Sequence, residues 1–572
     1  MKTSTRKPKA PAAARVATEV VVSGGPVSEQ AMGGALEGAS RFSREMLSWQ
    51  PTIVSPDMQI NRAKELTDAR GRDAMQNDGL MMGAVQTHKD SIVGSQYRLI
   101  LTPDFETLGY PETWAAEFVQ YVEGRFNLLA DSTECWFDAG RTLTLTDMLR
   151  LAVGGFVYTG EVLGTAEWLV DEPDRAFYTA IQMVSPSRLS NPNMEIDTDR
   201  LRRGVEKNRR GAPVAYHIRT SHPGEYYMGD PFPAWKRVPA RTPWGRRQVL
   251  HILEPQMPDQ TRGIADMVSV LKQMHMTKRF QDITLQNAVV NATYAAAIES
   301  ELPSEMVYAS MGAGGAGMAP MLREYLGALE AYIGGAGNIM IDGVKMPHLF
   351  PGTKLSMKPM GTPGGVGTDF EQSLIRHIAA PLGMSYEQFS KDYTKTNYSS
   401  ARASMAETWK FMQTRKKVVA DRFATMIFIL WLEEELGYLQ NEIPLPPGVS
   451  RQKLISTFYD PVMREAMCSC QWIGASRGQI DELKETQAAI MRIKSGLSTY
   501  QIELARLGED FRRVFAQQAR EQKIISAYGL NFSADATQPG ANDAQQTMTD
   551  DDEDPAADGD TETTTKKKGT KK

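Results

Sequence analysis

Cysteine is scarce in this chain of 572 residues, which contains only Cys135, Cys468 and Cys470. Three cysteines cannot build a disulfide framework, so we expect a protein of a reducing compartment. Cys468 and Cys470 form a CxC pair with no second pair, and the seven histidines are scattered along the chain. This pattern argues against a zinc site, and neither a metal nor another cofactor is expected.

Long apolar runs are also missing. The longest stretch dominated by apolar side chains is "ATMIFILWL", residues 424–432. A membrane-spanning helix needs about 20 such residues, so this stretch predicts a buried core helix instead. Near the basic N-terminus the longest apolar run is "VVV", which is too short for a secretory signal. We therefore expect a soluble, intracellular protein that makes no contact with a membrane.

Several enzyme motifs are absent or incomplete. The chain has no Gly-Lys dipeptide and no HExxH, which excludes a Walker A loop and that class of metalloprotease. Gly312, Gly314 and Gly317 satisfy GxGxxG, but the preceding "ELPSEMVYAS" is not the buried strand that a dinucleotide fingerprint needs. A flexible loop is expected there.

A second catalytic pattern is equally weak. "GASRG", residues 474–478, matches the GxSxG nucleophile elbow with Ser476 in the nucleophile position. That elbow requires a strand before it, and "REAMCSCQWI" is a poor strand candidate. A turn ahead of a helix is the simpler interpretation, so no enzymatic activity is expected. His88 and His377 lie among apolar neighbours on predicted helices, where structural imidazoles are expected.

The order of sequence patterns predicts an α+β fold. Helical periodicity covers residues 57–95 and 111–129, and short β runs follow from 152 to about 255. A periodic run of about 35 residues then predicts a helical rod roughly 50 Å long, a length typical of helices that protrude. Residues 303–367 are rich in Gly, Met and Pro, and predict a small irregular domain.

Three further helical parts follow. The first begins near Asp369 and ends or kinks at Pro381 and Gly383; the others cover about 400–436 and 472–530. The last part has breaks at "SGLST" and "RLGED". Residues 1–40 and the charged end of the chain are too polar to bury a core, and residues 548–572 hold eight acids followed by five lysines.

One charge pattern stands out in a chain whose formal net charge is −5. Residues 391–422 hold eight basic side chains against three acidic ones, a local charge of +5. Asn397, Tyr398, Ser399 and Ser400 add uncharged hydrogen-bond donors. Such side chains are typical of contacts to phosphate groups. A solvated helix face that binds nothing remains the alternative interpretation of the same residues.

Five sequence blocks resemble the lambda family of phage portal proteins and occur in that family's order, over about residues 60–530. The most specific block is "SYEQFSKDYTKTNYSSARAS". The other blocks are "GAVQTHKDSIVGSQYRL", "GVEKNRRGAPVAYHI", "DQTRGIADM" and "WIGASRGQIDELKETQA".

The resemblance implies the portal fold, with an α/β wing, a stem of long helices, a small clip and a helical crown, assembled as a homo-oligomeric ring of about a dozen copies. In this chain the implied boundaries are 1–40 for a disordered tail, 41–255 for the wing, 256–298 for the first stem helix, 299–367 for the clip, 368–383 for the second stem helix, 384–437 for the tunnel loop and helix, 438–535 for the crown and 536–572 for a disordered charged tail.

The resemblance further implies a DNA channel at one capsid vertex, used for genome packaging, head-tail joining and DNA ejection. The residues expected to line the channel are Lys391, Lys395, Asn397, Tyr398 and Arg402. The clip residues expected to contact the terminase or a connector are Gly312, Gly314, Gly317 and Met318. The implied partners are further copies of the chain, double-stranded DNA without sequence preference, the terminase large subunit, the major capsid protein and head-completion or tail connector proteins. The implied location is the virion, with assembly in the host cytoplasm.

Two other classes of function stay open at this point. A different minor virion structural protein would share the composition but would lack a DNA channel. An enzyme built on the Gly-rich or GxSxG pattern would bind or hydrolyse a nucleotide, or would depend on Ser476.

Overall fold

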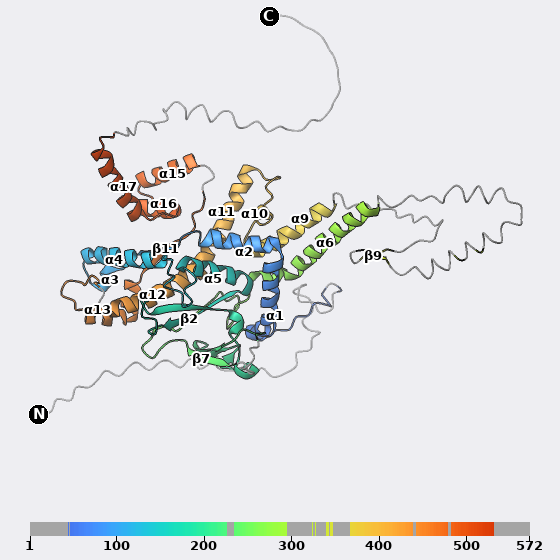
Figure 1. Ribbon diagram of the computed structural model, residues 1–572, viewed down its shortest axis with the longest axis horizontal. Coiled ribbons are helices and arrows are strands. Elements are labelled where there is room, and N and C mark those ends of the chain that lie inside the picture. Colours follow the sequence, from blue (N-terminus) through green and yellow to red (C-terminus); the bar gives the residue numbers. More distant parts are fainter. Residues whose placement is uncertain are drawn as a thin grey trace, which may run out of the picture.

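The computed structural model describes residues 44, 46–225, 234–294, 323, 327, 339–341, 344–346, 366–438, 442–478 and 482–530. These residues form helices and antiparallel sheets, so the predicted mixture of the two is confirmed (Figure 1). The predicted tails and most of the predicted clip lie outside the described residues.

The N-terminal helices form where helical periodicity predicts them. α1 (Pro56–Asn77) is followed at once by α2 (Gly79–Ile92), and the carboxylate of Asp78 caps α2 by accepting hydrogen bonds from two backbone N–H groups. α3 (Phe105–Leu108) and α4 (Glu112–Ala130) come next. The apolar residues that recur at spacings of four along α4 are all buried, namely Trp114, Phe118, Val122 and Phe126.

The strands form four antiparallel sheets among the described residues. β3-β2-β8 and β4-β5-β6-β7 lie in the predicted β region, and β1 pairs with β11 from far along the chain. The short pair β9-β10 falls within the predicted clip. The strand bounds are β1 Arg98–Leu101, β2 Glu161–Trp168, β3 Thr179–Val184, β4 Leu201–Arg202, β5 Val205–Lys207, β6 Pro213–Arg219, β7 Trp235–Pro239, β8 Val249–Leu253, β9 Ile339–Ile341, β10 Val344–Met346 and β11 Cys470–Ile473.

One boundary of the predicted β region was wrong. Residues 152–159 belong to helix α5 (Leu145–Thr159), not to a strand. Thr144 and Asp147 form a capping box that starts α5, and Gly160, with φ +76°, ends it in the left-handed conformation. The apolar run "GFVYT" is therefore the last turn of a buried helix, and β2 begins directly after it.

A helix runs through the core, as the stretch 424–432 predicts. α12 (Arg422–Gly437) buries Phe423, Phe428 and Trp431 almost completely. Phe126 of α4 packs edge-on against both Phe428 and Trp431, with ring centroids 5.4 and 5.2 Å apart. In the part of the chain that the structure describes, no helix has the length and apolar content that crossing a membrane requires.

Two helices project together from the body (Figure 1). α6 (Leu271–Tyr294) and α9 (Val366–Ala379) lie side by side, since Gln281 donates a hydrogen bond to Glu371 at 2.6 Å. The regular helix begins later than predicted, because residues 256–265 are not helical and a short 3₁₀ turn (Asp266–Val270) precedes α6. The 24 described residues of α6 span about 36 Å.

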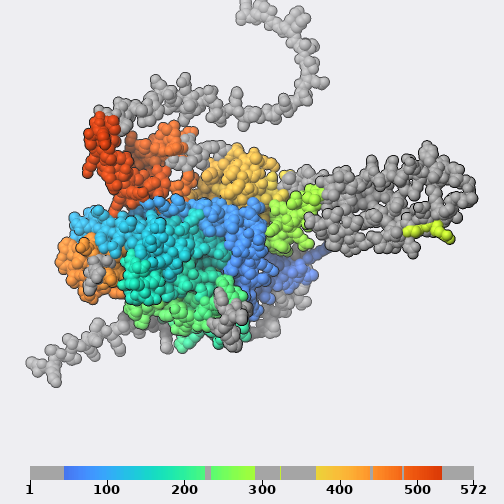
Figure 2. All heavy atoms as spheres, in the orientation of Figure 1, coloured from blue at the N-terminus to red at the C-terminus, as the bar shows by residue number. Residues whose placement is uncertain are grey.

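The remaining helices complete two parts of the molecule. The 3₁₀ turn Ala380–Leu382 and Gly383 end the second projecting helix as predicted, and lead to α10 (Tyr386–Ser390) and α11 (Tyr398–Arg415). α13 (Arg451–Phe458) and α14 (Pro461–Met467) pack at the body. The C-terminal helices form a separate lobe (Figure 2), and they are α15 (Glu482–Lys494), α16 (Tyr500–Arg506) and α17 (Phe511–Ala527).

Candidate nucleic-acid interface

The predicted channel segment begins as a turn held by specific contacts. Ser385 and Gln388 form a capping box at the start of α10. The side-chain oxygen of Gln388 also accepts a hydrogen bond from Thr408 Oγ1 at 2.6 Å, which ties α10 to α11. The segment therefore has a fixed base on α11, from which the loop 391–397 extends.

The five predicted channel residues lie close together in this loop and the first turn of α11. Lys391 ends α10 with φ +60°, and its Nζ donates to Thr87 Oγ1 at 3.2 Å. Lys395 and Arg402 are exposed, and neither has a carboxylate within ion-pair distance among the described residues. Asn397 caps α11 by accepting from Ser400 N at 2.8 Å.

Tyr398 is the first residue of α11, and the structure describes only its backbone. Arg402 and Lys410 lie eight residues apart on the same helix, a rotation of about 80°, so they share one side of it. Both are exposed. The exposed cations of this segment thus follow the loop and continue along α11, while their contact with DNA remains a prediction.

Two of the eight bases counted in the sequence are used inside the protein. Arg415 pairs with Glu254 at 2.7 Å and with Asp266 at 2.5 Å. Lys416 is buried and donates to Asp421 and to the carbonyl oxygen of Trp472, both at 2.8 Å. These two cations hold the junction of α11 and α12, where the helix passes through a π-helical turn (Lys416–Asp421).

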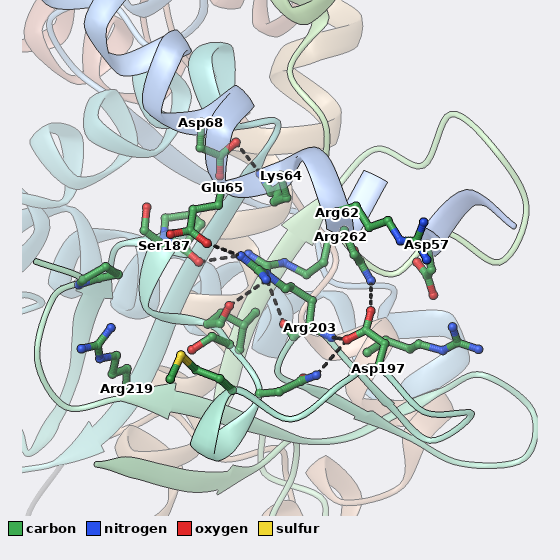
Figure 3. A pocket seen from close by; sticks show the side chains of 18 of the residues that line it. Asp57, Arg62, Lys64, Glu65, Asp68, Ser187, Asp197, Arg203, Arg219 and Arg262 are labelled. Atoms are coloured by element: carbon green, nitrogen blue, oxygen red, sulfur yellow. Dashed lines mark hydrogen bonds and ion pairs between the residues drawn. The ribbon is translucent and has the colours of Figure 1, made fainter. Parts of the chain in front are cut away.

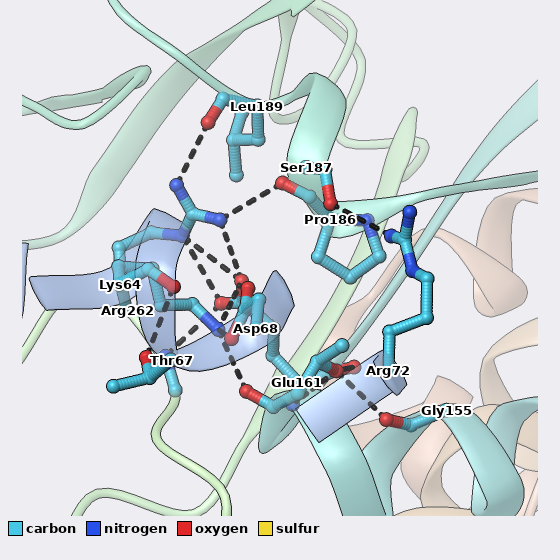
Figure 4. A network of polar contacts seen from close by, with 12 residues as sticks. Lys64, Thr67, Asp68, Arg72, Gly155, Glu161, Pro186, Ser187, Leu189 and Arg262 are labelled. Atoms are coloured by element: carbon cyan, nitrogen blue, oxygen red, sulfur yellow. Dashed lines mark hydrogen bonds and ion pairs between the residues drawn. The ribbon is translucent and has the colours of Figure 1, made fainter. Parts of the chain in front are cut away.

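A buried polar network fixes the start of the projecting helix to the body (Figure 4). Arg262 Nη2 pairs with Glu161 Oε1 at 2.5 Å, and its guanidinium also donates to three backbone carbonyls. Lys64 of α1 lies 3.4 Å from the same carboxylate and 2.8 Å from Asp68. Burial alone raises the pKa of Glu161, but Arg262 and Lys64 hold that pKa well below its usual range.

The network depends on close backbone contact. A Cβ on Gly263 would lie 2.1 Å from the carbonyl oxygen of Gly160, so no other residue fits there without movement. Sequence reasoning did not identify Glu161, Arg262 and Gly263 as a unit. The only sequence signal was the block "DQTRGIADM", which contains Arg262 and Gly263. Their partner Glu161 lies about 100 residues earlier, so no local pattern connects it with them.

The two glycine-containing motifs of the sequence have different outcomes. Gly312, Gly314, Gly317 and Met318 lie outside the described residues. A strand, β11, does precede "GASRG", so that part of the sequence interpretation was wrong. Its partner strand β1 lies about 370 residues earlier in the chain. Ser476 nevertheless lacks the positive φ of a strained nucleophile turn; within this segment only Gly478 has one, +73°.

The two histidines predicted to be structural differ in burial, and the cysteines form no disulfide. His88 is buried and structural as predicted, with Nε2 3.1 Å from the carbonyl oxygen of Leu382, and burial lowers its pKa to about 4. His377 is exposed, so the same prediction was wrong for it. All three cysteines are free thiols. The described residues contain no cluster of three or more His, Cys, Asp or Glu that could hold a metal ion.

Comparisons with known proteins agree along most of the chain. Residues 42–416 match the model of the family described as phage portal protein, lambda family. The chain is 38% identical to the portal protein of Escherichia phage N15 over 509 residues, which cover 89% of this chain and 93% of that protein. It is also 38% identical to portal protein B of Escherichia phage lambda over 494 residues, 86% of this chain and 90% of that one.

Solved structures add a more distant likeness. A chain from the neck of a native gene transfer agent particle, computed with C12 symmetry, is 13% identical with a TM-score of 0.32, over 78% of this chain and 98% of that one. The family assignment comes from the sequence matches. The chain belongs to the lambda family of phage portal proteins.

Proposed function

We propose that this portal protein assembles into a closed ring around a channel for double-stranded DNA at one capsid vertex. The observation that carries the proposal is the family match over residues 42–416, which includes six of the eight basic residues of the basic segment. A ring needs heterologous contacts that return on themselves, and long projecting helices set side by side offer area for them. The channel would serve packaging, head-tail joining and DNA ejection.

The distribution of charge on the basic segment supports a channel that guides DNA without holding it. Arg415 and Lys416 are neutralised inside the protein, so they cannot contact phosphates. Lys395, Arg402 and Lys410 remain exposed. Each phosphate contact strengthens binding through counterion release, so a few exposed cations per copy would position a duplex and still let it slide.

The parts of the molecule are assigned on the same basis. Residues 41–255 form the wing, 256–298 and 368–383 the stem, and 384–437 the tunnel loop and helix. Residues 438–535 form the crown. The clip, 299–367, would contact the terminase large subunit during packaging and connector proteins afterwards, while the wing would face the major capsid protein. The finished ring would belong to the virion, after assembly in the host cytoplasm.

The proposal predicts a specific loss of DNA contacts. Replacing Lys395 and Arg402 by alanine removes two exposed cations without touching a described ion pair. Binding of a short duplex by the assembled ring would weaken, and each lost phosphate contact would lower the salt slope of the affinity by about 1. The measurement is fluorescence anisotropy at several salt concentrations.

A matched control separates channel contacts from overall charge. Arg209 and Arg210 are exposed on the β5–β6 hairpin, far along the chain from the tunnel segment. Their double alanine variant carries the same change in charge and would leave the salt slope unchanged. An equal loss in both variants would contradict the assignment of Lys395 and Arg402 to the channel.

A further inference from the structure

A groove of about 830 Å³ opens beside α1, on a part of the molecule distinct from the tunnel segment (Figure 3). One wall is α1. The other is formed by the loop after β3 and by the ends of β6 and β7. Arg262, which pairs with the buried Glu161, also lines the groove. The groove is therefore a built feature of the wing, anchored on the network that fixes the stem.

Three arginines face this groove without a carboxylate partner among the described residues. Arg72 donates only to Ser187 Oγ, at 3.1 Å. Arg219 lies over the ring of Trp235 at 5.9 Å, and its Nε is buried without a hydrogen-bond acceptor. Arg62 is exposed on α1. Unpaired guanidinium groups at a partly buried site favour a ligand that carries carboxylates or phosphates.

The acidic residues of the groove are mostly engaged already. Asp197 accepts hydrogen bonds from Asn61 at 2.7 Å and from Asn191 at 2.8 Å. Glu65 pairs with Arg203 at 2.9 Å. Among the described residues, Glu195 is the one lining carboxylate that takes part in no side-chain hydrogen bond or ion pair. The groove thus keeps an excess of positive charge that none of the described residues neutralises.

The chain contains a segment with the complementary charge. Residues 550–562 carry eight acidic side chains and no basic one. We infer that this acidic segment binds in the groove, with its carboxylates on Arg72 and Arg219. A cavity of this volume accommodates a few side chains of an extended peptide, whereas it is too small for a duplex.

The inference does not rest on the channel. A portal ring could form and conduct DNA whether or not the acidic segment binds here. Occupation of the groove would instead place the acidic segment against the wing and away from the exposed cations of α11. In that position it could not compete with DNA phosphates for Lys395 and Arg402.

The test measures binding of a labelled peptide, residues 548–563, to the full-length protein. In that protein the eight acidic residues of the tail are replaced by Asn and Gln, so that they do not compete with the peptide. Anisotropy should show binding at low salt. Replacing Arg72 and Arg219 by glutamine should weaken it about tenfold or more, since charged hydrogen bonds are lost. The single variant Arg219→Gln leaves the Ser187 contact intact and serves if the double variant does not fold.

Four controls decide the outcome. Replacing Arg209 and Arg210 by glutamine changes the charge equally and should leave peptide affinity unchanged. A peptide whose acids are amidated should not bind. Stronger loss from Lys410→Gln with Lys417→Gln, or equal loss from the Arg209 and Arg210 variant, would overturn the inference. Displacement of the peptide by short duplex DNA at equal charge concentration would also overturn it, because the groove would then be a general anion site.

Discussion

Glu161 shows how much of this fold depends on one buried charge. Its carboxylate lies among Arg262, Lys64 and His251, and its Oε2 also accepts from the backbone N–H of Gly263 at 3.0 Å. Removing one member of a buried ion pair leaves the other charge without compensation. The network therefore fixes the geometry at the base of the projecting helices, where α1, β2 and the approach to α6 meet.

The first prediction concerns this carboxylate. Glu161→Gln should lower the free energy of unfolding by about 3 kcal/mol, because Arg262 would remain buried and charged. Thermal or denaturant unfolding measures the loss. Glu65→Gln is the matched control, since it also breaks a pair with an arginine, but at the surface, where such pairs contribute about 0–1 kcal/mol. Similar losses in both variants would contradict the account of the network.

Glu123 of α4 is a second residue whose environment has a measurable consequence. Its carboxylate accepts from Leu101 N at 2.6 Å and pairs with Arg512 of α17 at 3.2 Å. Burial raises its pKa to about 7, against the lowering effects of these two partners. The folded state therefore retains a proton that the unfolded chain releases at lower pH.

The second prediction follows from the direction of that shift. The stabilising contribution of Glu123 is fully present below its unfolded pKa, near 4.5, and is lost as pH rises through about 7. Glu123→Gln cannot titrate, so from pH 5 to pH 8 it should gain stability relative to the native chain, by up to about 3 kcal/mol. Unfolding midpoints across this range test it. Glu117→Gln, exposed on the same helix, should run parallel to the native chain.

At the scale of elements, local periodicity predicted the helices, whereas it could not predict a strand that depends on a distant partner. The helices α4 and α12 and the breaks between α15, α16 and α17 follow from local patterns. β11 does not, because Cys470–Ile473 becomes a strand only through its ladder with Arg98–Leu101. The same limit applies to the basic segment. The positive charge of this segment could be read from the sequence. The ion pairs of Arg415 with Glu254 and Asp266 could not, because those carboxylates lie about 150 positions earlier.

The third prediction concerns the turn between the second projecting helix, α9, and the short helix α10. Gly383 has φ +65°, and a Cβ there would lie 2.3 Å from the Phe411 ring on α11. Gly383→Ala should therefore cost about 2 kcal/mol of stability, from left-handed strain and displacement of that ring. Gly437→Ala, with no heavy atom within 4 Å of the added carbon, should stay within about 0.5 kcal/mol of the native chain. Unfolding measurements on both variants compare them, and equal effects would contradict this role for Gly383.

At the scale of the whole molecule, several described helices leave apolar surface exposed to solvent. Two helices project from the body, and the C-terminal lobe exposes Leu483, Met491 and Ile524. In α15 and α17 no described residue is buried, although their apolar side chains recur at helical spacing. Helices of this kind gain most of their stability from packing, which further copies in a ring would supply.

The measurement that tests the central claim most directly is the mass of the purified protein by light scattering, with negative-stain images of the same sample. One chain has a mass of 63.4 kDa. The account predicts closed rings of about a dozen copies with a central hole, as closed heterologous contacts require. A particle with several copies but no central opening would contradict the channel, and would favour a virion component that does not conduct DNA.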